Sequence, residues 1–154
     1  MSNYVDKEYL KLVGALPARD IDELDVVFPG TVDGISEAES RKADARLAKR
    51  YATPFQEPYP EALRSAVAYC VVYRLYQKRG PNPGSALEEA VLRDYNEAKD
   101  WFKEAANSKD GLIELPPRED GDDDKGVVQG GPLCVNDLTP YDAMQAQAEG
   151  AYGR

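Results

Sequence analysis

The chain has 154 residues, enough for one domain with a hydrophobic core, and its 42% hydrophobic and 31% charged residues suit a soluble globular protein. The net charge of −9 disfavours general nucleic-acid binding, because affinity for phosphates comes mostly from Lys and Arg. Histidine, the commonest general base and metal ligand, is absent. No apolar run approaches the about 20 residues of a membrane span, and we expect no secretory signal at the N-terminus.

The first predicted helix covers about residues 5–13. Apolar residues recur there at i, i+4, i+7 and i+8, which predicts one buried face made of Val5, Tyr9, Leu12 and Val13. Gly14 and Pro17 should end this helix. A short helical turn is expected at 21–27, capped by Asp20 and ended by Pro29-Gly30, with one face made of Ile21, Leu24 and Val27.

The next predicted helix begins at Ser36 and runs to about Tyr51. Ser36 and Glu39 have the spacing of a capping box, in which the serine hydroxyl accepts from the amide of the glutamate and the glutamate accepts from the serine amide. The apolar face is expected to consist of Ala43, Leu47, Ala48 and Tyr51. The opposite face is polar, with Arg41, Asp44 and Lys49.

A sharp corner rich in proline follows. Pro54, Pro58 and Pro60 cannot continue a helix, because each lacks an amide donor and disfavours helical geometry in the residue before it. We expect Tyr51 and Phe55 to be core residues that fix the angle between the two flanking helices.

The helix after the corner should begin at Pro60 and run to about Arg79, before Gly80. It carries two apolar stripes, which predict the central helix of the domain. One stripe consists of Leu63, Val67, Cys70, Val71 and Leu75, and the other of Tyr69, Val72, Tyr73 and Tyr76.

The last predicted helix opens at Ser85 with a second capping box, completed by Glu88, and frays near Asn107. Its apolar positions are Leu87, Val91, Tyr95, Ala98 and Phe102, with Trp101 and Ala105 beside them. Residues 111–116 form a short extended exit, which either lies against the bundle or pairs with another chain.

Taken together, these elements predict an all-α fold: a small bundle of about four helices in residues 1–115, followed by an acidic Gly/Pro-rich C-terminal arm in residues 116–154. The arm holds three Lys or Arg and eight Asp or Glu, which is −5 of the net charge of −9. One interpretation is a disordered tail, and the other is an arm that orders on binding a neighbour.

We find no recognisable catalytic, cofactor-binding or metal-binding constellation, and we expect that the protein is not an enzyme. The acidic run Asp122–Asp124 lacks the spaced ligands of a calcium loop and is interpreted as a solvated linker. Gly130-Gly131 lacks the Gly-Lys-Ser/Thr of a phosphate loop. Cys70 and Cys134 are expected to be free thiols, and the tyrosines at 69, 73 and 76 are expected to belong to the core rather than to a base-stacking surface.

Across about residues 3 to 116, the helical features have an order and spacing that are carried by Tyr4-Val5, Tyr9-Leu10, Ala43, Leu47, Arg50-Tyr51, Pro54, Pro60, Leu63, Ala66, Tyr73-Arg74-Leu75-Tyr76, Arg93, Tyr95, Ala98, Trp101-Phe102 and Gly111-Leu112-Ile113-Glu114-Leu115. In these features the chain resembles the phage head–tail connector proteins, also called adaptor or head-completion proteins, and most closely their Mu-type branch. The arm beyond Pro116 is not covered, and its length and acidity depart from the family.

The resemblance implies a structural protein of the virion neck that assembles in the host cytoplasm as a ring, typically twelvefold, beneath the portal. Such a ring extends the DNA channel and docks the tail or a stopper or tail-completion protein, while genomic DNA passes through without sequence-specific binding. Neither a cofactor nor a membrane is implied. By analogy, residues 127–154 are the candidate portal-binding arm.

Two other interpretations stay open at this point. One is a different neck component, a tail-completion or stopper protein on a related helical scaffold. The other is a non-viral helical interaction domain, or an enzyme that uses carboxylates alone.

Overall fold

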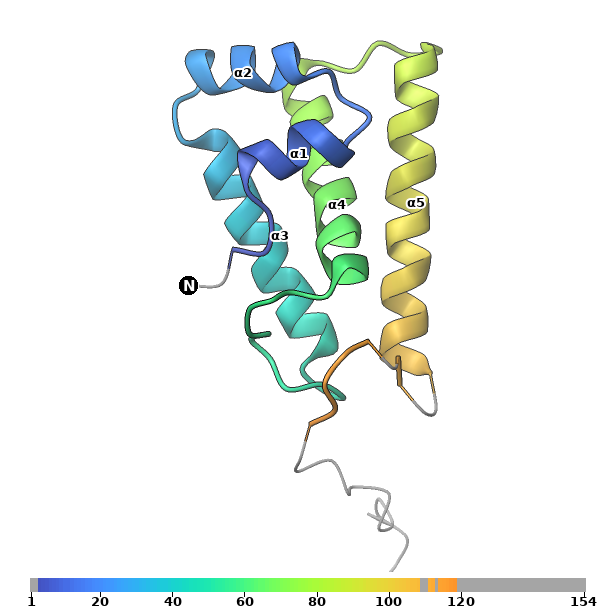
Figure 1. The fold of residues 1–154 in the computed structure, drawn as a ribbon. Helices are drawn as coiled ribbons and strands as arrows, with labels where there is room; N and C mark the ends of the chain where they lie inside the picture. Colours follow the sequence, from blue (N-terminus) through green and yellow to red (C-terminus); the bar gives the residue numbers. More distant parts are fainter. Residues whose placement is uncertain (1–2, 109–110, 113, 119–154) are drawn as a thin grey trace, which may run out of the picture. The chain divides into compact units, whose positions relative to one another are not determined.

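Five α-helices make up the part of the chain that the computed structural model describes, which is residues 3–108, 111–112 and 114–118 (Figure 1). They are α1 (Lys7–Val13), α2 (Ala18–Val27), α3 (Thr31–Leu47), α4 (Glu61–Arg79) and α5 (Ala86–Asn107). The predicted all-α fold is confirmed. The predicted short turn at 21–27 is a helix of ten residues, and the predicted arm lies almost wholly outside the described residues.

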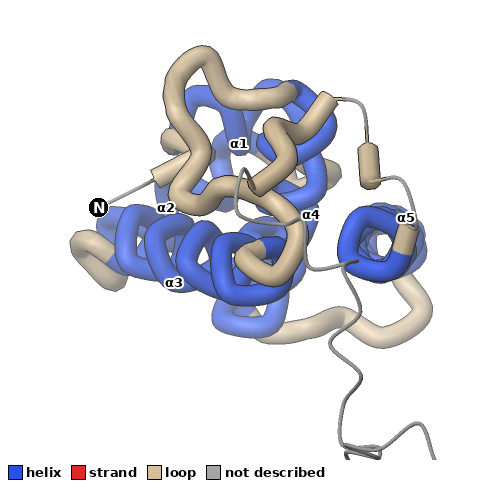
Figure 2. The backbone as a smooth tube through the Cα atoms, turned by 90° about the horizontal axis from the view of Figure 1, so that it is seen from below, coloured by secondary structure: helices blue, strands red, loops and turns tan. Residues whose placement is uncertain are grey.

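Helix α4 lies between α3 and α5 and contacts all four other helices (Figure 1). Seen from below, α5 is viewed end-on while α3 runs obliquely beside α4 (Figure 2). The predicted first stripe of α4 is fully buried, and Val72 and Tyr76 of the second are buried as well. This confirms α4 as the central helix. Among the described residues, no helix has both the length and the apolar character to cross a membrane.

Helix α1 is shorter than predicted, because Asp6 caps it by accepting from the amide of Tyr9 at 2.8 Å. Its buried face is also rotated from the prediction. Leu12, predicted to be buried, is 81% exposed, whereas Leu10 is fully buried. Gly14 ends α1 as predicted, and its amide donates to Leu10. A Cβ at Gly14 would lie 2.5 Å from Cγ2 of Val72, so this glycine lets α1 end directly against α4.

Helix α3 contradicts the predicted capping box at Ser36. The helix begins at Thr31 after Gly30, which has a φ of 75°, so Ser36 lies in its second turn and is buried. Glu39 cannot return to an N-terminal amide there, and it pairs with Lys42 and Arg74 instead. The longer helix forms because its first turns carry apolar side chains that the core takes up, above all the buried Val32. Burial of these side chains stabilises the earlier start of the helix more than a capping box at Ser36 would stabilise the later one.

Helix α3 also ends at Leu47 rather than near Tyr51, whereas the boundaries of α4 and α5 agree closely with the predictions. Pro60 occupies the N-cap of α4, one residue before the predicted position, and α4 ends at Arg79. The Ser85 hydroxyl accepts from the Glu88 amide at 3.1 Å and so caps α5 as predicted. The Glu88 carboxylate accepts from the amide of Gly84, one residue earlier than a capping box requires.

Candidate interaction surfaces

The side chains considered above as chemical candidates serve packing in the structure. Cys70 is buried in α4, and burial raises the pKa of its thiol to about 11, which keeps it protonated and unreactive at neutral pH. Tyr73 stacks on Tyr95 of α5, with ring centroids 4.0 Å apart, and the Tyr76 hydroxyl accepts from the amide of Asn82 at 2.8 Å. Tyr76 is therefore a core residue, as interpreted, while Tyr69 and Tyr73 are half-buried and pack against the core.

Within the described residues, no group of three or more Cys, Asp or Glu side chains lies close enough together to hold a metal ion. The acidic run Asp122–Asp124, Gly130-Gly131, Cys134 and the proposed portal-binding segment 127–154 lie outside the described residues. The described part also offers interaction surfaces, which are positioned by the corner, the exit segment and helices α1 and α2.

The corner and the exit segment form one junction. Tyr51 and Phe55 are both buried, as predicted. Tyr51 pairs with Pro117 in an isolated antiparallel bridge, in which Ala52 donates to Pro116 at 3.2 Å and Arg118 donates to Arg50 at 2.9 Å. The exit segment thus lies against the bundle, which was one of the two predicted possibilities. The described part of the chain ends at Arg118, beside the C-terminal end of α3.

The N-terminal segment is fixed to the same corner through Tyr4. Its ring packs edge-on against Phe55 and Tyr59, with centroids 5.9 and 5.0 Å away. Its hydroxyl donates to Asp44 and accepts from the amide of Phe55, and its backbone oxygen accepts from Arg64. A groove of about 580 Å³ adjoins this cluster. Arg64 lines this groove, and its guanidinium already donates to Tyr4 and covers the ring of Tyr9. We therefore interpret the groove as structural.

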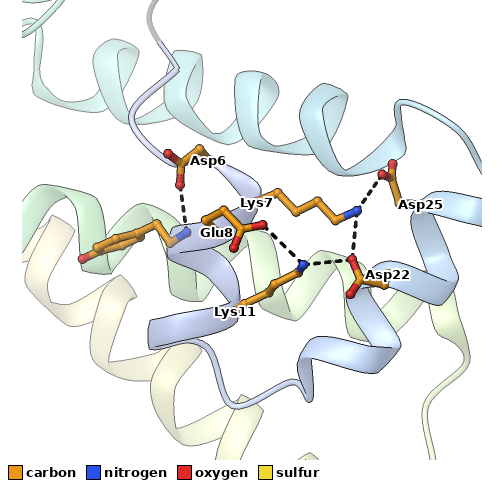
Figure 3. Close-up of polar contacts among 7 residues, drawn as sticks. Asp6, Lys7, Glu8, Lys11, Asp22 and Asp25 are labelled. Carbon is orange, nitrogen blue, oxygen red and sulfur yellow. Dashed lines mark hydrogen bonds and ion pairs between the residues drawn. The ribbon is translucent and has the colours of Figure 1, made fainter.

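An ionic cluster holds α2 against α1 (Figure 3). Lys7 bridges Asp22 at 3.0 Å and Asp25 at 2.8 Å, and Lys11 bridges the same Asp22 at 3.0 Å and Glu8 at 3.4 Å. Hydrogen bonds to Asp25 and Asp22 raise the pKa of Lys7 to about 12. Hydrogen bonds from the lysines lower the pKa values of both aspartates, with Lys7 the largest cause for each. At neutral pH Lys7, Lys11, Asp22 and Asp25 are therefore charged, and the cluster fixes the side of α2 that faces α1.

Fixing that side of α2 leaves apolar side chains pointing outward at its C-terminal end. Val26 is 80% exposed, Val27 65% and Phe28 44%. We call these three residues the α2 edge. Val27 was predicted to share a buried face with Ile21 and Leu24, and only the latter two are buried. Three successive large apolar residues at one place on a surface are typical of a contact site for another protein.

A second surface lies between the C-terminal halves of α3 and α5. This groove has a volume of about 280 Å³ and is lined by Arg46, Lys99, Phe102, Lys103, Ala106 and Asn107. We call it the α3–α5 groove. The guanidinium of Arg46 lies 5.4 Å from the centroid of the Phe102 ring, which makes the apolar floor of the groove. Three cations around an aromatic floor suit an acidic partner segment.

Sequence reasoning missed both surfaces, for different reasons. The α2 edge had a signal in the unbroken apolar run Val26-Val27-Phe28, because a helix packed on one side cannot bury every residue of such a run. The α3–α5 groove had none, since Arg46 and Lys99 are 53 positions apart and only the packing of α3 on α5 brings them together.

Comparison with known proteins identifies a matching family. A family model described as Bacteriophage Mu, Gp36 matches residues 4–128, which include all five helices and the junction of the corner with the exit segment. Neither a curated protein nor a solved structure matches the chain.

Proposed function

Because the chain belongs to the family of bacteriophage Mu Gp36, and is therefore a phage protein, we propose that it is a head–tail connector of the virion neck. In this role, copies of the chain form a ring under the portal protein, which extends the DNA channel and offers the tail, or a stopper or tail-completion protein, a surface on which to dock. Genomic DNA passes through the ring without sequence-specific contacts. The role is structural and not enzymatic.

The observation that carries this proposal is the extent of the family match. It spans 125 of the 154 residues, from residue 4 to residue 128, and so includes the whole helical bundle. Its position agrees with the stretch that resembles the Mu-type proteins, and several residues that carry this resemblance belong to the core. Tyr4, Leu47, Tyr51 and Leu63 from that set are all buried.

The α2 edge supports assembly into a ring. A ring is built from heterologous contacts, in which one patch of each copy meets a different patch on the next copy. Val26 and Val27 offer such a patch, because their side chains are mostly exposed and leave apolar surface in water. An interface that covers this surface gains about 25 cal/mol for each Å² of apolar area removed from water.

Electron microscopy of the purified full-length protein, with and without purified portal, tests the proposal. We expect rings on the portal, and we expect the variant Val26→Asp/Val27→Asp to lose them while circular dichroism stays unchanged. Leu92→Asp is the matched control, because Leu92 is an exposed apolar residue of α5, away from the α2 edge. Failure of the wild-type protein to bind portal in the absence of other neck proteins would overturn the connector role. Binding only to an assembled connector would instead identify a stopper or tail-completion protein.

A further inference from the structure

We propose that the α3–α5 groove binds a carboxylate-rich segment, and that its occupant is the acidic run Glu119–Asp124 of the same chain. This inference does not rest on the proposed neck function. It rests on the charge of the groove, on the position of Arg118, the last described residue, and on the sequence that follows Arg118.

The groove concentrates positive charge in a protein whose net charge is −9. Arg46, Lys99 and Lys103 all line it. Lys103 pairs with Asp100 at 3.0 Å, on the exposed side of α5. Among the residues that the structure describes, Arg46 and Lys99 form no ion pair, and their cationic groups lie near the rings of Phe102 and Tyr95 instead, at 5.4 and 5.5 Å from the centroids. Two cations are thus available to a carboxylate without first breaking an existing pair.

The small size and partly apolar floor of the groove restrict the kind of partner that can bind there. The Phe102 ring is buried, and Ala106 and Asn107 complete a small, partly apolar surface between two helices. A volume of about 280 Å³ fits a few side chains of an extended peptide rather than a folded domain. A short acidic peptide therefore matches the groove in both size and charge.

The chain itself supplies such a peptide next to the groove. The amide of Arg118 donates to the carbonyl oxygen of Arg50 at 2.9 Å, and its guanidinium donates to Ala48 at 3.5 Å, two residues beyond Arg46 of the groove. The next six residues, 119–124, contain five carboxylates. When extended, six residues span about 20 Å, whereas Ala48, which Arg118 contacts, is only two positions from Arg46 of the groove.

Tethering favours the run of the same chain over that of another molecule. A segment joined to its site by a short linker has an effective concentration in the millimolar range. Each exposed ion pair contributes only about 0–1 kcal/mol, so a weak acidic peptide needs this advantage to occupy the groove. The consequence is that the C-terminal arm starts from a defined place on the bundle, beside the ends of α3 and α5.

Amide chemical shifts of the full-length protein test the inference at low salt. The variant E119Q/D120N/D122N/D123N/D124N, which neutralises the run, should shift the amide signals of Lys99, Phe102, Lys103 and Ala106 and leave those of α2 in place. Raising the salt to about 1 M, where the Debye length is about 3 Å, should remove most of the difference. Neutralising Asp137 and Asp142 in the same arm is the matched control and should leave the groove signals unchanged.

A second comparison makes the result specific to the groove. In the background R46Q/K99Q/K103Q, neutralising the run should no longer shift the signal of Phe102. The inference is overturned if neutralising the run leaves the groove signals of the otherwise native chain unchanged, or if the changes lie elsewhere on the bundle. It is also overturned if they grow with protein concentration, which would make a second copy the occupant. Shifts of the same amides on adding a short DNA duplex, with no effect of the run, would identify phosphate as the ligand.

Discussion

The hydroxyl of Tyr51 donates a hydrogen bond to the carbonyl oxygen of Ala105 at 2.8 Å, and it accepts one from the amide of Leu112 at 2.9 Å. Ala105 lies in the last turn of α5, where carbonyl groups have no partner within the helix. One buried side chain therefore satisfies the end of α5 and the exit segment together, from a position just after α3.

Tyr51→Phe should lower the free energy of unfolding by about 1–3 kcal/mol, because it leaves a buried carbonyl and an amide without their partner. Urea denaturation measures this change. Tyr69→Phe is the matched control, since Tyr69 is a half-buried tyrosine of α4, and it should change the free energy by less than about 0.5 kcal/mol. Equal effects of the two substitutions would show that the Tyr51 hydroxyl contributes nothing beyond its ring.

Gly14→Ala should destabilise the fold by about 1–3 kcal/mol, the usual cost of overpacking a core. The new Cβ would lie 2.5 Å from Cγ2 of Val72 and 2.9 Å from the carbonyl oxygen of Leu10. Gly34→Ala is the control, because Gly34 lies in α3 and a Cβ added there would meet no atom within 4 Å. That substitution should stabilise the protein by about 0.5–1 kcal/mol. Thermal unfolding of both variants gives the comparison, and a loss of stability in both would refute the close contact as the cause.

Ser36→Ala and Ser85→Ala should change the free energy of unfolding in opposite directions or by different amounts. The Ser36 hydroxyl is buried without a hydrogen-bond partner among the described residues, so its removal should be neutral or stabilising. The Ser85 hydroxyl caps α5, and its removal should cost about 0.5–2 kcal/mol. Chemical denaturation of the two variants is the measurement. A cost of about 1 kcal/mol at Ser36 would mean that it caps a helix after all.

The ionic cluster between α1 and α2 should make stability depend on pH. The pKa values of Asp22 and Asp25 are lowered in the folded state, chiefly by hydrogen bonds from Lys7. Their contribution is therefore present above the unfolded pKa of about 3.9 and is lost as the pH falls through the lowered values. The pKa of Lys7 is raised to about 12. Its contribution is present below the unfolded value of about 10.4 and is lost as the pH rises toward the folded value.

Lys7→Gln should accordingly lower the urea midpoint most between about pH 5 and pH 9, and the loss should shrink as the pH falls below about 3.9, the unfolded pKa of the aspartates. Lys49→Gln is the control, because Lys49 is exposed and forms no ion pair among the described residues. If Lys7→Gln lowers the urea midpoint by the same amount at every pH, the lysine acts through packing rather than charge.

Removal of residues 119–154 should abolish binding to the portal while the helical content of the bundle is kept. Because Arg118 bonds to Arg50, a cut after residue 118 preserves the junction. A cut after residue 116 breaks it and should cost about 0.5–1.5 kcal/mol more, the contribution of one hydrogen bond. Replacing residues 127–154 by a Gly/Ser linker of equal length separates the role of these side chains from that of length. Portal binding that survives the cut after 118 would refute the arm as the contact.

The helices with strong periodicity could be predicted from the sequence, and the errors have specific physical causes. In α1, Leu10 and Leu12 differ by about 160° around the helix, so only one of them can face the core. The choice of Leu10 depends on where α4 lies. In α3, the pattern Ser36…Glu39 is a sound local signal, and it was overruled because Val32 and Ile35 join the core and extend the helix toward its N-terminus.

The interaction surfaces were harder to predict than the helices. The buried positions of Tyr51 and Phe55 followed from the apolar character of the corner, but the two hydrogen bonds of the Tyr51 hydroxyl depend on residues more than 50 positions away. The α3–α5 groove depends likewise on a pairing of helices that no short stretch of sequence encodes. A local sequence pattern predicts which face of a helix is apolar. It does not predict which helix faces other helices leave exposed.

The hydrogen bond from the amide of Arg118 to the carbonyl oxygen of Arg50 determines which part of the bundle first bears a pulling force on the C-terminal arm. A partner that pulls on the chain beyond Arg118 first strains the two backbone hydrogen bonds between the exit segment and the corner. The next residue to carry the load is Tyr51. Its hydroxyl donates to Ala105 at the end of α5, and its backbone lies just after the end of α3, so the load reaches both helices. The force is thus shared by two long helices packed on α4.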